Sequence, residues 1–125
     1  MQTLYRSTRD PKGQTITASQ AVLQGLSPDG GLYVPTSIPE IDLDLNELKD
    51  LSYQDLAYKI LRLLFSDYTD EELRSCIDKA YGDQWDTQEI APVDYHADNA
   101  YLELFHGPTI AFKDVALQLL PHLMT

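Results

Sequence analysis

Cysteine and long apolar runs are nearly absent from this sequence of 125 residues. Cys76 is the single cysteine, so no internal disulfide can form, and we expect a reducing compartment. No stretch approaches the roughly 20 apolar residues that a membrane-spanning helix needs. The first residues also lack the basic and then apolar pattern of a signal peptide. These absences predict a cytoplasmic protein. We expect Cys76 to be a small buried residue of a helix rather than a nucleophile.

Basic residues are also few. The chain has 9 Lys and Arg against 20 Asp and Glu, which gives a net charge of −11. The excess lies in residues 40–98, which hold 16 acids and five bases. Such a segment repels nucleic acid, and its simplest role is a solvated acidic surface. The histidines are too dispersed to suggest a metal site; they are His96, His106 and His122.

The remaining composition is that of a folded protein, with 43% hydrophobic and 23% charged residues. The length allows one modest domain, or a small domain and the beginning of another. The pattern changes near residues 81–86, from short strands and capped helices to two strands and a terminal helix. We therefore expect a division into residues 1–82 and 83–125.

Three threonine or serine residues mark expected helix starts in the first part. Thr17 begins a capping-box pattern for a helix that ends near Gly25, and Ser52 and Thr69 cap two further helices. The helix after Ser52 is expected to turn inward four aliphatic side chains, which are Leu56, Ile60, Leu63 and Leu64. The helix after Thr69 is expected to bury Leu73, Ile77 and Ala80. Strands are expected at residues 4–7 and 32–34, and later at 91–95 and 100–104.

Lys113 lies in an unusual position for a cation. If residues 110–125 form one helix, Lys113 shares an apolar line with Leu117, Leu120 and Met124. The polar residues gather on the opposite face, where Asp114 would serve as a partner of the helix dipole. Lys113 can be read as a lysine whose stem lies along apolar surface with its charge in water. Alternatively, burial and the helix N-terminus lower its pKa and prepare a nucleophile that attacks an aldehyde.

The residues before Lys113 give further candidates. Gly107 and Pro108 end a strand. Thr109 is then placed to cap the terminal helix, and free N–H groups at that helix start could bind a substrate carboxylate or phosphate. His106 could take part in proton transfer, or it could be a hydrogen-bonded structural residue.

Two stretches resemble threonine synthase. The run Leu-Glu-Leu-Phe-His-Gly-Pro-Thr-Ile-Ala-Phe-Lys-Asp at 102–114, followed by Ala-Leu-Gln at 116–118, looks like the cofactor-lysine motif of that family. The runs Tyr-Arg-Ser-Thr-Arg-Asp at 5–10 and Ala-Val-Leu-Gln-Gly-Leu-Ser-Pro-Asp-Gly-Gly-Leu-Tyr-Val-Pro at 21–35 resemble its N-terminal region. The motifs occur in the family's order and at its usual separation.

The resemblance implies a pyridoxal phosphate enzyme of the tryptophan-synthase β fold type (fold-type II), with Lys113 as the Schiff-base lysine. The implied reaction converts O-phospho-L-homoserine and water into L-threonine and phosphate. Lys113, once freed, would move protons at the α and β carbons of the substrate. The resemblance also places Phe112 against the cofactor ring, as an alternative to a core phenylalanine. Thr109 and His106 are candidate substrate-binding residues.

The expected fold class is therefore mixed, α+β followed by α/β. Residues 1–82 would form a small N-terminal domain with short strands and several helices. Residues 83–125 would form the first strands and the lysine-bearing helix of the catalytic domain. No glycine-rich phosphate loop is present, since the pair at 30 and 31 precedes no helix. We expect a truncated fragment that is inactive alone and binds no pyridoxal phosphate. Its expected partner is the remainder of the catalytic domain.

Two other classes stay open. The parent protein could be a threonine-synthase-like phospholyase that eliminates phosphate from a related amino acid. The chain could instead be an acidic interaction module whose apolar terminal helix associates with a second copy or docks onto a partner.

Overall fold

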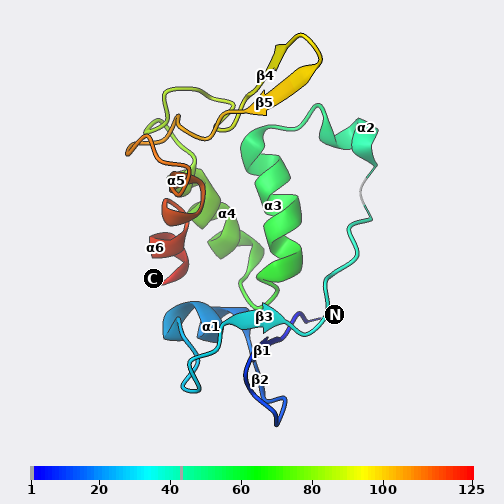
Figure 1. The fold of residues 1–125 in the computed structure, drawn as a ribbon, viewed down its shortest axis with the longest axis vertical. Helices are drawn as coiled ribbons and strands as arrows, with labels where there is room; N and C mark the ends of the chain where they lie inside the picture. The colour runs from blue at the N-terminus through cyan, green and yellow to red at the C-terminus, as the bar shows by residue number, and fades with distance from the viewer. Residues whose placement is uncertain (1, 43) are drawn as a thin grey trace.

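The computed structural model describes residues 2–42 and 44–125. Its elements occur along the chain as β1 (Tyr5–Ser7), β2 (Thr15–Ile16), α1 (Ala18–Gln24), β3 (Tyr33–Pro35), α2 (Leu45–Leu48), α3 (Tyr53–Leu64), α4 (Asp70–Ala80), β4 (Val93–His96), β5 (Asn99–Leu102), α5 (Asp114–Leu117) and α6 (Leu120–Leu123). A small sheet and α1 lie at one end, α3 and α4 form the middle, and the β4–β5 hairpin projects from the other end (Figure 1).

The N-terminal sheet has the order β2-β1-β3, and both pairings are antiparallel. Strands at 4–7 and 32–34 are confirmed within one residue, whereas the two-residue β2 was not predicted. The turn before β3 is tightly packed, because a Cβ on Gly31 would lie 2.1 Å from the Ser7 hydroxyl oxygen. The Ser7 hydroxyl and the Gly31 N–H both donate to Asp29, at 2.7 and 2.8 Å. These contacts connect the turn to β1.

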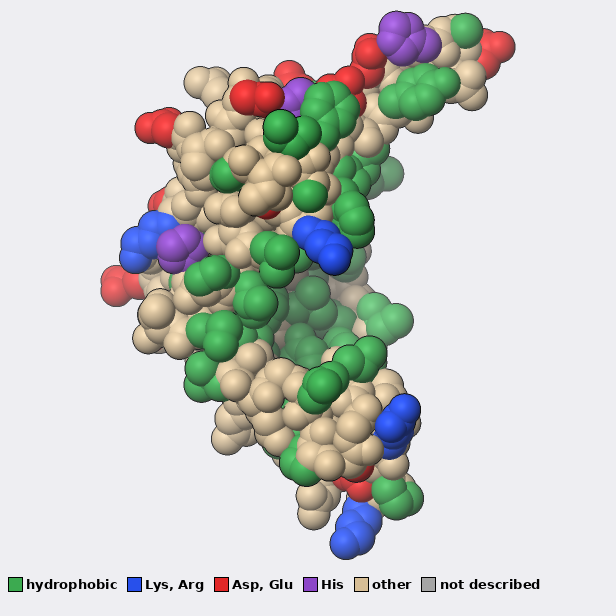
Figure 2. Space-filling model, turned by 60° about the vertical axis from the view of Figure 1, so that its left-hand side comes forward, with side chains coloured by type: hydrophobic (Ala, Val, Ile, Leu, Met, Phe, Trp, Pro, Cys, Tyr) green, Lys and Arg blue, Asp and Glu red, His purple; other side chains and the backbone are tan. Residues whose placement is uncertain are grey.

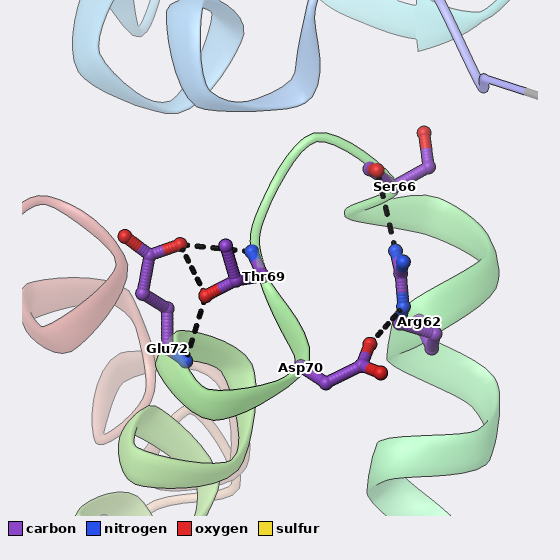
Figure 3. Close-up of polar contacts among 5 residues, drawn as sticks. All are labelled: Arg62, Ser66, Thr69, Asp70 and Glu72. Atoms are coloured by element: carbon purple, nitrogen blue, oxygen red, sulfur yellow. Dashed lines mark hydrogen bonds and ion pairs between the residues drawn. The ribbon is translucent and has the colours of Figure 1, made fainter.

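The three helix caps predicted for the first part of the chain are confirmed. Thr17 and Thr69 form capping boxes with Gln20 and Glu72, and the Ser52 hydroxyl accepts from the N–H of Asp55 at 3.1 Å. Figure 3 shows the Thr69–Glu72 box beside the ion pair between Arg62 and Asp70, whose atoms lie 2.7 Å apart. The Thr69–Glu72 box and this ion pair hold the turn between α3 and α4.

Helix α4 supplies the centre of the hydrophobic core. Leu73, Ile77 and Ala80 are fully buried, as predicted, and Cys76 is buried beside them. Burial raises the pKa of the Cys76 thiol, which therefore stays protonated at neutral pH. The rest of the core comes from segments after α4, namely Tyr81, Trp85, Ile90, Leu119 and Leu123.

The inner face predicted for α3 is wrong. The side chains of α3 that pack on the core are Tyr53, Ala57, Tyr58 and Leu61, followed by Phe65 just after the helix. Ile60, from the predicted set, is exposed. Aromatic residues account for the rotation, because the Tyr53 ring packs edge-on against Tyr81, with centroids 4.9 Å apart. A pattern built on aliphatic residues alone does not find this face.

The single helix predicted for residues 110–125 is also wrong. Two four-residue helices, α5 and α6, take its place. Pro121 has no N–H to donate to the carbonyl of Leu117, so a continuous helix would lose a hydrogen bond and suffer a clash there. At the other end, Ile110 has a φ of 62°, in the left-handed region, which prevents the helix from starting there.

The terminal segment nevertheless packs on α4. The Tyr68 hydroxyl donates to the carbonyl of Leu123, and the Tyr81 hydroxyl donates to that of Val115, both at 2.8 Å. Burial raises the pKa of Tyr68 to about 12, so this hydroxyl remains a donor. The Cys76 thiol donates to the carbonyl of His122 at 3.2 Å. Residues on both sides of the expected 82/83 division thus share one core.

The two strands expected after the division form the β4–β5 hairpin, with Val93 opposite Leu102 and His96 opposite Asn99. All eight of its residues are exposed. The short helix α2 was not predicted. No helix within residues 2–42 and 44–125 has the length and apolar character to cross a bilayer.

Replacing Thr69 by Ala should lower the free energy of unfolding by about 0.5–2 kcal/mol at neutral pH, because the first turn of α4 loses its side-chain cap. The hydrogen bonds from Thr69 lower the pKa of Glu72 in the folded state. Their contribution is therefore present above the unfolded pKa of Glu72 and is lost as the pH falls toward the folded one. Urea denaturation at several pH values measures both effects.

The matched control is Ser75→Ala, at an exposed position of the same helix, which should change stability by less than about 0.5 kcal/mol. Equal losses for the two variants, or a Thr69→Ala loss that does not shrink at low pH, would contradict the proposed role of the cap.

Candidate functional site

Lys113 lies on the outside of the molecule, immediately before α5. The residues predicted to share its apolar line are also largely exposed, with Leu117 at 51% and Met124 at 46%. The burial that one of the two readings of Lys113 needs is therefore not found in this chain. Its neighbour Phe112 is 65% exposed, so it is not a core phenylalanine. An exposed amine beside an exposed aromatic ring is the first part of the site.

Asp114 is buried, contrary to the polar surface position predicted for it. Only 2% of the residue is exposed. Its carboxylate accepts the Thr109 N–H at 2.8 Å and the Thr109 hydroxyl at 2.9 Å. Burial raises the pKa of this carboxyl, but the hydrogen bonds from Thr109 outweigh it and the pKa is lowered overall. Asp114 is thus a charged acceptor that closes the turn before Lys113.

Gly107 is required by this turn. A Cβ at position 107 would lie 2.5 Å from the Cβ of Asp114, so any other residue would displace the carboxylate. The Ile110 N–H donates back to the carbonyl of Gly107 at 3.0 Å. Residues 107–114 therefore form a closed turn, and we call this segment the lysine turn. Its backbone direction determines where the Lys113 side chain leaves the fold.

The capping role predicted for Thr109 is wrong, because the helix begins at Asp114 and Thr109 donates to Asp114 instead. The free N–H groups expected at the helix start were those of Ile110 and Ala111; the Ile110 N–H donates to the carbonyl of Gly107, and an anion-binding role for the Ala111 N–H stays a prediction. The carboxylate of Asp114 accepts from the N–H and the hydroxyl of Thr109. A substrate-binding role for the Thr109 side chain stays a prediction.

His106 bridges two carboxylates. Its Nδ1 lies 2.5 Å from the nearer oxygen of Asp86, and its Nε2 lies 2.7 Å from that of Glu103. The hydrogen bond with Glu103, followed by that with Asp86, raises the pKa of the imidazole. This bears out the hydrogen-bonded alternative for His106; a contact with substrate stays a prediction. Asp86 was missed because it is 20 residues away in sequence, where no local pattern can indicate the pairing.

An apolar groove of about 370 Å³ lies beside the lysine turn. Its walls come from α1, α3 and the α5–α6 segment, and include Val22, Leu61, Phe65, Val115, Leu117 and Leu120. Figure 2 shows a hollow surrounded by hydrophobic side chains on this side of the molecule. No group of three metal-ligating side chains suited to a metal ion is found in the described part of the chain.

Comparisons with known proteins agree with the resemblance in the two motifs. Residues 4–81 match the family model described as the threonine synthase N terminus. Threonine synthase of Saccharomyces cerevisiae is 41% identical over 96% of this chain. Threonine synthase-like 1 of Homo sapiens is 39% identical over 84% of it.

A solved structure shows the same fold. The crystal structure of pyridoxal-phosphate-bound threonine synthase from Brucella melitensis superimposes with a TM-score of 0.86 and 34% identity over 98% of this chain. The chain spans only about a quarter of the length of the threonine synthases, which is 25% of the yeast protein and 26% of the Brucella structure. It spans 15% of the human protein. With its motifs, its fold and 78 of its residues inside the family model, the chain belongs to the threonine synthase family, whose N-terminal region it matches.

Proposed function

We propose that this chain is the N-terminal part of a threonine synthase and that Lys113 is the residue to which pyridoxal phosphate is attached. The observation that carries the proposal is the exposed amine of Lys113 at the end of a closed, internally bonded turn. In this proposal residues 1–82 are the small N-terminal domain. Residues 83–125 begin the catalytic domain of the tryptophan-synthase β type.

The described residues fit one part of the cofactor. The Lys113 amine is accessible to an aldehyde carbon, and the exposed ring of Phe112 is available to lie against a planar ring. A phosphate cradle needs free N–H groups, yet those of Gly30 and Gly31 donate to the Ser27 carbonyl and to Asp29. In this proposal the phosphate and the pyridine nitrogen are held by the remainder of the catalytic domain. For this reason we expect the 125 residues alone to be inactive and to bind no pyridoxal phosphate.

The reaction proposed for the complete enzyme converts O-phospho-L-homoserine and water into L-threonine and phosphate. Pyridoxal phosphate, when bound, supplies an electron sink for carbanions. Lys113 takes a proton from the substrate α carbon and returns protons during the later steps, and its amine must be neutral when it accepts. Asp114 does not compete for this role, because its carboxylate accepts from Thr109. Its contribution is to fix the turn.

The apolar groove is the surface that the remainder of the catalytic domain would cover. The relatives are about four times as long as this chain. The groove adjoins the segment that carries Lys113, and its lining contains no charged side chain. Covering it would bury Leu117 and Leu120 and surround Lys113 with protein. Burial of the lysine would then disfavour its charged form in the complete enzyme, as its role requires.

The match to Threonine synthase-like 1 of Homo sapiens supports a second candidate. Its identity, 39%, is close to that of the yeast threonine synthase, 41%. The alternative function is elimination of phosphate from a related amino acid without formation of threonine. Product analysis of the complete enzyme with O-phospho-L-homoserine separates the two candidates, since only the first releases both threonine and phosphate.

Replacing Lys113 by Ala in a full-length threonine synthase that carries this segment should abolish the absorbance band of lysine-bound pyridoxal phosphate and lower kcat by at least about 10²–10⁴-fold. The control is Lys79→Ala, on the exposed side of α4. This variant should retain the absorbance band and the wild-type kcat. A Lys113→Ala protein that keeps the band would overturn the assignment, as would threonine formation by the 125 residues alone.

The groove gives a second test, in which Leu117 and Leu120 are both replaced by Gln. In the 125-residue chain, where both are partly exposed, each change should cost less than about 0.5 kcal/mol of stability. In the full-length enzyme each should cost about 1.5–3 kcal/mol, because the side chain is buried there. Ile38→Gln, at a position 89% exposed, is the control for both proteins.

Equal losses in the two proteins would show that the catalytic domain does not cover the groove. A 125-residue chain that dimerises in sedimentation experiments, and becomes monomeric on the double replacement while the full-length enzyme is unaffected, would favour self-association instead.

A further inference from the structure

The loop after α4 is fixed to the core immediately before Asp86. Trp85 is buried, and its indole N–H donates to the carbonyl of Ala80 at 2.8 Å. The next residue, Asp86, contacts the region of His106 twice. Its N–H donates to the His106 carbonyl at 3.1 Å, and its carboxylate accepts from the His106 ring. The buried Trp85 is therefore connected, through its neighbour Asp86, to His106, which precedes the lysine turn.

The imidazole of His106 is held from both sides. Its side chain is 15% exposed, and it lies against Phe105 with ring centroids 4.5 Å apart. Asp86 and Glu103 offer only acceptor oxygens when ionised, so both ring nitrogens must carry hydrogen to bond them. His106 is then an imidazolium that joins the loop after α4 to the segment following β5. We call this arrangement the histidine clamp.

The lysine turn begins where the histidine clamp ends. Gly107 follows His106 directly and lies against Asp114, which also receives both donors of Thr109. The Asp114 N–H donates to the carbonyl of Ala111 at 3.0 Å. These contacts leave little freedom between Gly107 and Asp114. A change in the orientation of His106 would move the whole turn, including Lys113.

We propose that His106 is a positioning residue for Lys113: by joining Asp86 to Glu103 it fixes the direction in which the lysine turn leaves the fold. The proposal rests on the function proposed for Lys113. In this proposal His106 acts without touching the reacting atoms, since both of its ring nitrogens are engaged. Its influence on the reaction is exerted through the backbone of residues 107–113.

The charged groups that face His106 are Asp86, from the loop after α4, and Glu103, after β5. The hydrogen bond with Glu103 is the largest influence that raises the pKa of His106, and Asp86 adds to it. Because the folded pKa is raised, the clamp is complete at low pH and is lost as the pH rises through that pKa. Loss of the histidine clamp above the pKa of His106 should therefore change the conformation of the lysine turn.

The first measurement is an NMR titration of the 125-residue chain, without cofactor. The amide signals of Thr109 and Asp114 should shift at the same pH as the ring nitrogens of His106. Asp86→Asn should lower that pH, and His106→Gln should remove the shared transition. His96, which pairs with Asp94 in the exposed hairpin at 2.8 Å, is the control, and its titration should leave the turn unchanged. Turn signals that ignore the titration of His106 would overturn the proposal.

The second measurement uses the full-length enzyme. His106→Gln should lower kcat by about 10–10²-fold through a small displacement of Lys113, with little change in KM, and the alkaline decrease that follows the His106 titration should disappear. His96→Gln should match wild type. A normal kcat for His106→Gln, with a reduced melting temperature only, would show a merely structural residue and overturn the proposal.

Failure of the proposed function would have a different result. Lys113→Ala would then keep the cofactor band, whatever the titration of the isolated chain shows. The two proposals can therefore fail separately.

Discussion

The packing of the last twelve residues on α4 is the constraint on which the rest of the structure depends. Leu119 and Leu123 are buried in the same core as Leu73 and Ile77. Three side chains from α4 or its flanks, Tyr68, Cys76 and Tyr81, donate to carbonyls of the terminal segment. These bonds satisfy backbone groups that two very short helices cannot satisfy themselves. The lysine turn is held at one end by this packing and at the other by the histidine clamp.

Local signals in the sequence were sufficient for the features that depend on near neighbours. Thr17, Ser52 and Thr69 specify helix starts through bonds within three residues, so the chain does not need to be folded for them to be recognised. The same holds for the buried side of α4, which has a regular apolar spacing. Both features depend on neighbours along the chain.

The parts that failed depend on distant partners or on a single backbone feature. The face of α3 is set by the contact of Tyr53 with Tyr81, 28 residues later. The terminal helix is divided at Pro121, a breaker that the helical wheel did not take into account. For the candidate site, the motif indicates Lys113 as a candidate, whereas the burial of Asp114 and the pairing of His106 with Asp86 exist only in the folded chain.

The brevity of α5 and α6 has a consequence for the order of folding. A helix of four residues lies far below the roughly 12–15 residues at which an isolated helix becomes even marginally stable in water. Residues 114–125 can therefore hold their shape only on a surface that already exists. During synthesis from the N-terminus, α3 and α4 leave the ribosome first and can provide that surface. The residue proposed to carry the chemistry is thus among the last to reach its place, after α3 and α4 have formed.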